Sequence, residues 1–159
     1  RVEGRKIRRI CETQNGNRNN TIANIAGAAR GKLPELSRYG DDYDTKGGNG
    51  VRDYFHVVDM AEGHVKALDK ILSGKRGVQI FNLGTGVGYS VLDIVHAFEE
   101  ANGVKIPYKI VGRRPGDIAT CYSDPTKAKE VIGWQAKRGL AAMCADSWRW
   151  QKQHPNGVE

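Results

Sequence analysis

The sequence predicts an α/β fold, and three observations support that class. Short runs rich in β-branched and aromatic residues alternate with stretches of helical periodicity. The 159 residues suffice for one domain with a sizeable core, and 39% apolar with 27% charged residues is typical of a globular protein. No apolar run approaches the roughly 20 residues that cross a membrane, so we expect no membrane partner.

The net charge of +7 is concentrated at the N-terminus, where residues 1–20 hold six basic side chains and two acidic ones. We interpret residues 1–18 as a disordered basic tail and residues 19–159 as the folded domain. A basic tail also contacts nucleic acid non-specifically, but we expect no specific nucleic-acid partner. Three widely spaced cysteines, Cys11, Cys121 and Cys144, indicate free thiols in a reducing compartment such as the cytoplasm.

The first predicted helix covers residues 21–30. Asn19 or Asn20 precedes it and can cap its unpaired N–H groups. A short strand at residues 36–40 follows, and then an acidic, Gly-rich loop at residues 41–50.

The central stretch runs from Gly50 to Asp59. Its residues 54–58 are mostly β-branched or aromatic, which predicts a buried strand at residues 52–58. Asp59 would then cap a helix that ends near Leu72, with Glu62 completing a capping box. This helix carries an apolar stripe at helical spacing: Ala61, Val65, Leu68, Ile71 and Leu72.

A second strand is predicted at residues 78–83, before the glycine cluster of residues 84–88. The glycine spacing fits neither the dinucleotide-binding fingerprint nor a P-loop, so we interpret the cluster as a tight strand-to-helix connection. Ser90 then caps a helix, with Asp93 placed for a capping box, and Gly103 ends it.

The remaining elements follow at short intervals. A strand at residues 106–111 contains a proline and is therefore expected at a sheet edge. A short extended piece is predicted at residues 119–122, a helix after Asp124 and Pro125, and a last helix at residues 140–153. The four histidines show no metal-ligand spacing, and we assign the three tryptophans to packing.

Two separate stretches carry arginines suited to an anion. Arg52 begins the central strand, and Arg114 lies in the loop Arg113–Asp117. Arginine binds phosphate through two hydrogen bonds, and a carboxylate such as Asp117 accepts from sugar hydroxyls, so together they suit a nucleotide. Two alternatives stay open: Arg52 pairs with Asp53 or another carboxylate, and Arg114 forms only a surface pair with Asp117.

Several motifs, taken in order, closely resemble the C-terminal part of the UDP-glucose 4-epimerase family of extended short-chain dehydrogenases. The resemblance covers about residues 19–157 and implies a substrate-binding part, a small mixed sheet with flanking helices, without the NAD-binding Rossmann half. The motifs are Gly50–Asp59, Ala61–His64, Phe81–Gly86, Arg113–Asp117, Trp148–Gln151 and His154–Gly157.

The resemblance implies roles at the diphosphate of a UDP-sugar. Asn20 would hydrogen-bond it, and Arg52 and Arg114 would neutralise it, with Tyr54 close by. At the nucleoside, the resemblance implies that Ser37, Arg38 and Tyr39 run past the uracil, that Val91 packs there, and that Asp117 takes the ribose hydroxyls.

Cys121 would stand at the sugar end of the pocket. Some family members have a bulky tyrosine at this position, so the small side chain implies tolerance of UDP-N-acetylhexosamines as well as UDP-glucose and UDP-galactose.

The catalytic pair of the family, Tyr-x-x-x-Lys, lies in its N-terminal NAD-binding domain, and no tyrosine of this chain has a lysine four residues later. The resemblance implies NAD-mediated oxidation and re-reduction at C4 in an intact enzyme that is often a homodimer, with this chain inactive alone. Two alternatives remain: a fragment of another nucleotide-sugar dehydratase or decarboxylase, and a non-catalytic UDP-sugar-binding module.

Overall fold

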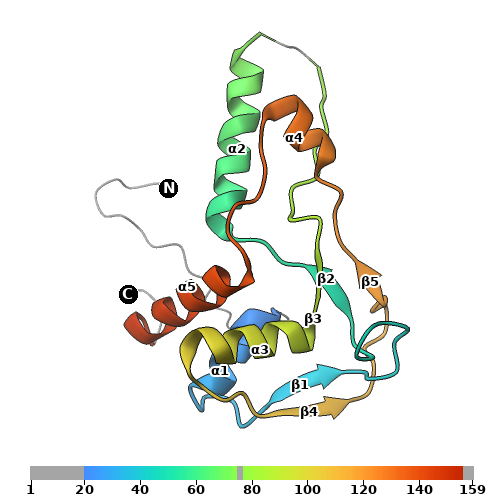
Figure 1. The fold of residues 1–159 in the computed structure, drawn as a ribbon, viewed down its shortest axis with the longest axis vertical. Coiled ribbons are helices and arrows are strands. Elements are labelled where there is room, and N and C mark those ends of the chain that lie inside the picture. The colour runs from blue at the N-terminus through green and yellow to red at the C-terminus, as the bar shows by residue number, and fades with distance from the viewer. Residues whose placement is uncertain (1–19, 75–76, 156–159) are drawn as a thin grey trace.

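The computed structural model describes residues 20–74 and 77–155, and the tail expected at residues 1–18 lies outside them. Five helices and five short strands alternate within the described residues, which confirms the α/β class. Figure 1 shows two regions. We call the lower one the body; it contains α1, α3, α5, β1 and β4. We call the upper one the arm; it contains α2, α4 and the extended segment 77–87.

The body packs three helices around one apolar core: α1 (Thr21–Ala29), α3 (Val91–Asn102) and α5 (Leu140–Gln153). A parallel pair of strands, β1 (Leu36–Tyr39) and β4 (Tyr108–Val111), lies below them (Figure 1). The core residues are Ile25, Ala26, Ala28, Leu36, Ile94, Val95, Phe98, Ile106 and Cys144.

The helix starts of the body follow the sequence predictions. The side chain of Asn20 accepts hydrogen bonds from the N–H groups of Ile22 and Ala23 at the start of α1. Ser90 and Asp93 form the expected capping box at the start of α3. Two of the three body helices therefore begin at local capping signals, whereas α5 begins after Gly139 without a side-chain cap.

A three-stranded mixed sheet joins the two regions. Its central strand, β2 (Val51–Asp53), runs antiparallel to β3 (Gly88–Ser90) and parallel to β5 (Thr120–Cys121). Arg52 of β2 lies directly opposite Cys121 of β5. The sheet thus holds the central arginine between two separate stretches of chain.

The predicted strand at residues 52–58 is confirmed only at Arg52 and Asp53, because β2 ends at Asp53 and α2 (Val57–Leu72) begins four residues later. The ring nitrogen Nδ1 of His56 caps this helix by accepting the N–H of Val58. The capping box of Asp59 and Glu62 is also wrong, since Asp59 lies inside the first turn and bonds to a distant loop. Aromatic and β-branched composition alone did not distinguish a strand from a helix start.

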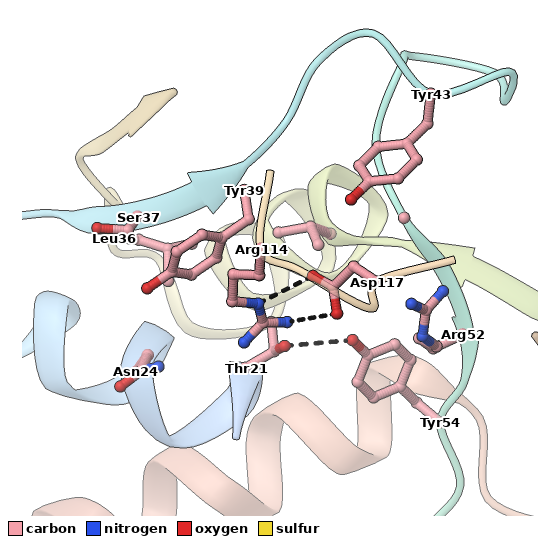
Figure 2. Close-up of a pocket in the computed structure, with 12 residues that line it drawn as sticks. Thr21, Asn24, Leu36, Ser37, Tyr39, Tyr43, Arg52, Tyr54, Arg114 and Asp117 are labelled. Atoms are coloured by element: carbon pink, nitrogen blue, oxygen red, sulfur yellow. Dashed lines mark hydrogen bonds and ion pairs between the residues drawn. The ribbon is translucent and has the colours of Figure 1, made fainter. Parts of the chain in front are cut away.

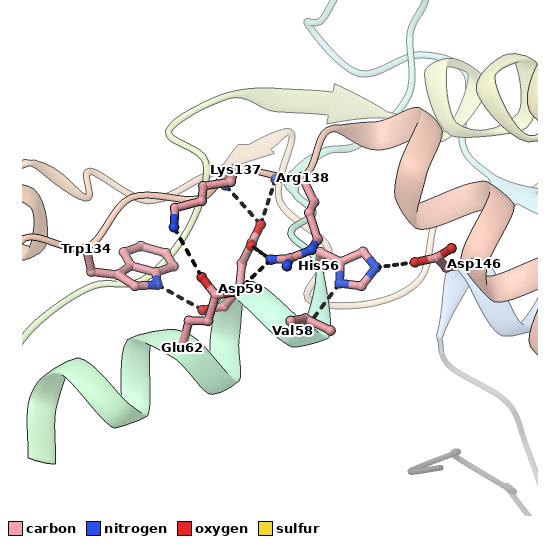
Figure 3. A network of polar contacts seen from close by, with 8 residues as sticks. All are labelled: His56, Val58, Asp59, Glu62, Trp134, Lys137, Arg138 and Asp146. Atoms are coloured by element: carbon pink, nitrogen blue, oxygen red, sulfur yellow. Dashed lines mark hydrogen bonds and ion pairs between the residues drawn. The ribbon is translucent and has the colours of Figure 1, made fainter. Parts of the chain in front are cut away.

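The arm is fixed to the rest of the chain by polar groups (Figure 3). The buried carboxylate of Asp59 accepts the backbone N–H groups of Lys137 and Arg138, at 3.0 and 2.9 Å, and pairs with the Arg138 guanidinium. Trp134, which packs beside α4 (Thr126–Ile132), donates its ring N–H to the Asp59 carbonyl at 2.8 Å. His56, whose Nδ1 is occupied, donates from Nε2 to Asp146 of α5 at 3.1 Å.

Many apolar side chains of the arm are left on the surface, although Ala128, Ile132 and Trp134 form a small buried cluster there. The stripe predicted on α2 is solvent-exposed, with Leu68 at 57% and Leu72 at 82% exposure. The predicted strand at residues 78–83 is not a strand in the structure, and its Val78 and Ile80 are 94% and 74% exposed. We refer to the exposed apolar residues of these two segments together as the open apolar face: Val65, Leu68, Ile71, Leu72, Val78 and Ile80.

Candidate functional site

One pocket collects most of the residues that the sequence analysis singled out (Figure 2). It lies between the start of α1, the strand β1, the strand β2 and the loop after β4. Its lining residues are Thr21, Asn24, Leu36, Ser37, Tyr39, Tyr43, Gly50, Arg52, Tyr54, Val91, Arg114 and Asp117. Seven of the ten expected site residues are in this set, from four separate stretches of chain.

Arg114 and Asp117 stand at the two ends of one tight turn. Pro115 and Gly116 are its central residues, and Gly116 has φ +84°, as a type II turn requires. The N–H of Asp117 donates to the carbonyl of Arg114 at 3.2 Å and closes the turn. This geometry holds the two side chains close together at the pocket.

The Arg114 guanidinium pairs with both oxygens of the Asp117 carboxylate. Nε lies 2.9 Å from Oδ2, and Nη2 lies 3.3 Å from Oδ1. The same guanidinium is 4.4 Å from the ring centre of Tyr39. The pair that the sequence left open as an alternative therefore exists, and it lies on the wall of the pocket.

Arg52 reaches the pocket from β2 with most of its donors available. Its Nη1 donates to the carbonyl of Val51 at 2.8 Å, and within the described residues it forms no ion pair. The alternative of an Arg52–Asp53 pair is not realised, because Asp53 is engaged elsewhere. Tyr54, the next pocket residue of this stretch, donates its hydroxyl to Thr21 at 3.3 Å.

Asp53 ties three segments together behind Arg52. Its carboxylate accepts from Thr85 and Gly86 in the glycine-rich turn and from Ser123 after β5. Burial by itself raises the pKa of Asp53, but the hydrogen bonds from Ser123 and Thr85 outweigh it and hold this pKa below its ordinary value. Asp53 thus stays ionised and anchors β2, the strand that carries Arg52.

Three expected site residues lie outside the pocket. Asn20 borders a second cavity, together with His56 and Trp150. Arg38 is only 7% exposed, and its Nε has no hydrogen-bond partner within the part of the chain that the structure describes. Cys121 is exposed on β5, opposite Arg52. The structure does not bring these three to the Arg114–Asp117 pair.

Two pocket residues that the sequence analysis missed deserve a physical account. Asn24 lies on α1, and its spacing of four residues from Asn20 gave no signal, because Asn20 borders the other cavity. Tyr43 lies in the loop that was interpreted only as acidic and Gly-rich. Gly40, at φ +77°, turns the chain back so that the buried ring of Tyr43 lies beneath Arg113, 4.0 Å from its guanidinium.

The glycine-rich turn does not fit a dinucleotide. A Cβ at Gly84 would lie 1.9 Å from Ser123 Oγ and 2.3 Å from Asp53 Oδ2. The space above this glycine is therefore filled by protein side chains and not left for a ligand. The N–H groups at the start of α3 are already used by Ser90 and Asn49. The described residues therefore offer no site for NAD at this turn.

Two further site types have no candidate among the described residues. Residues 20–74 and 77–155 contain no cluster of three or more histidine, cysteine, aspartate or glutamate side chains that could hold a metal ion. In the same ranges, no helix is long and apolar enough to span a bilayer.

Comparison with known families identifies relatives of this chain. Residues 9–147 match the family described as GDP-mannose 4,6 dehydratase. The chain is 60% identical over 151 residues to UDP-glucose 4-epimerase of Bacillus subtilis and 53% identical over 148 residues to that of Homo sapiens. These matches cover 95% and 93% of the chain but only 44% and 42% of the relatives. The chain thus spans less than half the length of these relatives.

Solved structures show the same likeness. UDP-glucose 4-epimerase of Stenotrophomonas maltophila, with bound NAD and formylated UDP-arabinopyranose, superposes with a TM-score of 0.87 at 46% identity. The Bifidobacterium longum epimerase, in complex with NAD+ and UDP, gives 0.85 at 52% identity. The aligned parts are 91% and 90% of this chain and 43% and 42% of those chains. The resemblance noted in the sequence is therefore confirmed.

Proposed function

Because this chain belongs to the GDP-mannose 4,6-dehydratase family and is similar to UDP-glucose 4-epimerases, we propose that it is the UDP-hexose-binding part of such an epimerase. One observation carries the proposal. Arg52 and Arg114, which are 62 positions apart in the sequence, line the same pocket. Two guanidinium groups from separate elements match the two charged phosphates of a nucleoside diphosphate.

The pocket offers matching groups to the rest of a uridine diphosphate. Asp117 accepts hydrogen bonds from the ribose hydroxyls, and Val91 packs beside the nucleoside. Ser37, Arg38 and Tyr39 of β1 run along the uracil. Strand β1 supports this role, because Ser37 and Tyr39 both line the pocket.

Asn20 and Cys121, two residues expected to contact the UDP-sugar, do not line this pocket. Asn20 binds the diphosphate in the intact protein, although here its side-chain oxygen caps α1 and its place is in the neighbouring cavity. Cys121 faces the hexose. Its exposed position opposite Arg52 and its small side chain support this role and the acceptance of UDP-N-acetylhexosamines.

The redox chemistry is carried out by the NAD-binding part, which the relatives have outside the region that matches this chain. In the whole protein, NAD supplies oxidation and re-reduction at C4 and thereby interconverts UDP-glucose and UDP-galactose. The described residues contribute the hold on the UDP portion, so that binding energy remote from C4 positions the hexose. We therefore expect residues 19–159 to be inactive alone, and the intact protein to be a cytoplasmic homodimer.

The open apolar face is the surface that the NAD-binding part covers. Exposed apolar patches of this kind mark interaction sites. Its members come from one helix and from an extended segment that has no strand partner among the described residues. A β-sheet edge in the NAD-binding part would give this extended segment a strand partner.

Calorimetric titration of the chain with UDP, GDP and UMP tests the proposal. We expect UDP to bind in the micromolar range, UMP to bind at least about tenfold more weakly because it lacks one phosphate, and GDP to be rejected. Tighter binding of GDP than of UDP would favour the dehydratase alternative, and no binding of any nucleotide would contradict the proposal. An epimerase assay of this chain with NAD should show no turnover.

A further inference from the structure

The Arg114 guanidinium is already engaged on two sides before a phosphate reaches it (Figure 2). Both carboxylate oxygens of Asp117 accept from it, at 2.9 and 3.3 Å, and the Tyr39 ring lies 4.4 Å away. Arg114 and Asp117 are each partly exposed, at 42% and 25% of their side chains. A diphosphate that is to accept two hydrogen bonds from this Nε–Nη2 edge must therefore displace the carboxylate from it.

The pairing is built into the backbone and does not depend on a chance side-chain encounter. Arg114 and Asp117 are the first and last residues of a turn whose Pro115 and Gly116 fix its shape. The carboxylate consequently remains beside the phosphate position even after Arg114 moves. A bare anion then meets both competition for Arg114 and repulsion from Asp117.

From this geometry we propose that Asp117 selects against free pyrophosphate and thereby reserves the pocket for nucleoside diphosphates. The inference rests on the proposed function, since it concerns the same pocket. A nucleoside diphosphate brings ribose hydroxyls, which are hydrogen-bond donors, to the displaced carboxylate. Pyrophosphate brings no donor, so it meets the competition and the repulsion without compensation.

Arg52 makes the contrast within the pocket clear. It bonds only to the carbonyl of Val51 and forms no ion pair among the described residues, so it is available to any anion. The Nε–Nη2 edge of Arg114 becomes available only when Asp117 finds other donors. Arg52 therefore binds any phosphate, whereas Arg114 binds strongly only a phosphate whose attached group donates hydrogen bonds to Asp117.

The inference predicts opposite effects of one substitution on two ligands. In Asp117→Asn, pyrophosphate should bind about two- to fivefold more tightly, the range expected when a partly exposed ion pair no longer competes. UDP should bind about tenfold more weakly, because its ribose loses a charged acceptor. Wild type should also discriminate UDP from 2′-deoxy-UDP, and the variant should do so less.

Calorimetry at fixed pH and ionic strength measures these affinities. The control is Asp42→Asn, which removes a more exposed carboxylate, 69% against 25% for Asp117, paired with the neighbouring Arg113. Asp42 does not line the pocket, so both affinities should stay within about twofold of wild type. Asp117→Ala, a second variant that removes the whole carboxylate, should give the same ranking if the asparagine variant is poorly folded.

Pyrophosphate affinity that stays unchanged or falls in both Asp117 variants would overturn the inference. That outcome is distinct from failure of the proposed function, in which wild type does not bind UDP at all. A gain in pyrophosphate affinity that also appears in Asp42→Asn would assign the effect to general charge, and would equally overturn the selective role of Asp117.

Discussion

The body and the arm differ in where their apolar side chains lie. In the body, α1, α3 and α5 turn their apolar faces toward one another, and Phe98 and Ile25 are fully buried. In the arm, α2 has an equally regular apolar stripe, but Leu68 and Leu72 point to solvent. The face of α2 that is buried in this chain instead carries Asp59 and Gly63.

The difference shows that periodicity identifies an apolar face but not its partner. The arm is held by buried polar groups, above all the Asp59 carboxylate and the Trp134 ring N–H (Figure 3). Gly63 permits this close approach, because a Cβ there would lie 2.6 Å from Leu83 and 3.1 Å from Trp134. The body is held mainly by apolar packing, whereas the arm combines a small apolar cluster around Trp134 with these hydrogen bonds.

The largest effect should come from truncating the core of the body. Phe98 has no exposed surface and packs edge-to-face on Trp148. Phe98→Ala should lower the free energy of unfolding by about 3–5 kcal/mol through lost burial and the resulting cavity. Leu68→Ala on the open apolar face should change it by no more than about 0.5 kcal/mol, because both residues favour helix.

Urea unfolding followed by circular dichroism measures both values. Similar losses for the two variants would remove the distinction between body and arm, because they would mean that Leu68 is buried in solution.

The body was also the region that the sequence predicted best. Two of its helices have local start signals, Asn20 for α1 and the Ser90–Asp93 box for α3, and these signals act within a few residues. The arm was predicted poorly because its structure depends on distant groups. No local pattern shows that Asp59 bonds to Arg138, 79 residues later.

A second prediction concerns the polar attachment of the arm. Asp59→Asn should lower the free energy of unfolding by about 1.5–3 kcal/mol at neutral pH, because a buried carboxylate loses charge-assisted hydrogen bonds. Asp69→Asn is the matched control on the same helix, where the carboxylate is exposed, and should be nearly neutral. Equal effects of the two substitutions in urea unfolding would show that Asp59 does not anchor the arm.

The same carboxylate gives a pH dependence with a definite sign. Burial alone would raise the pKa of Asp59, but the N–H groups of Arg138 and Lys137 and the Arg138 guanidinium lower it below its ordinary value of 3.8. Its contribution is present above pH 3.8 and is lost as the pH falls through the lower folded pKa. Asp59→Asn should therefore flatten the decline in stability between neutral and acidic pH, and an unchanged acid profile would contradict this.

A third prediction tests the junction between body and arm. Gly84→Ala places a methyl group against Ser123 and Asp53, and should cost about 1–3 kcal/mol of stability through overpacking. Gly112→Ala meets nothing within 4 Å and should be close to neutral. Thermal unfolding of both variants checks the difference. A neutral Gly84→Ala would show that the Asp53 cluster does not hold β2 tightly.

More of the pocket than of the arm could be predicted, because the residue types in its motifs indicate a ligand as well as a local structure. Arginine, proline, glycine and aspartate in one short loop predicted an anion-binding turn, and Arg114 and Asp117 lie there. Tyr43 was missed because its position depends on the reversal at Gly40, which composition does not reveal. Asn20, Arg38 and Cys121 were singled out by resemblance alone, and the geometry around them depends on contacts beyond this pocket.

The most direct test of the account is UDP affinity in three arginine variants, measured by calorimetry. Arg52→Ala and Arg114→Ala should each weaken UDP binding about tenfold or more, since each loses charged hydrogen bonds to phosphate. Arg113→Ala should change it less than about threefold, because this neighbouring guanidinium is paired with Asp42 and does not line the pocket. Equal losses in all three variants, or a loss only in Arg113→Ala, would contradict a diphosphate held between Arg52 and Arg114.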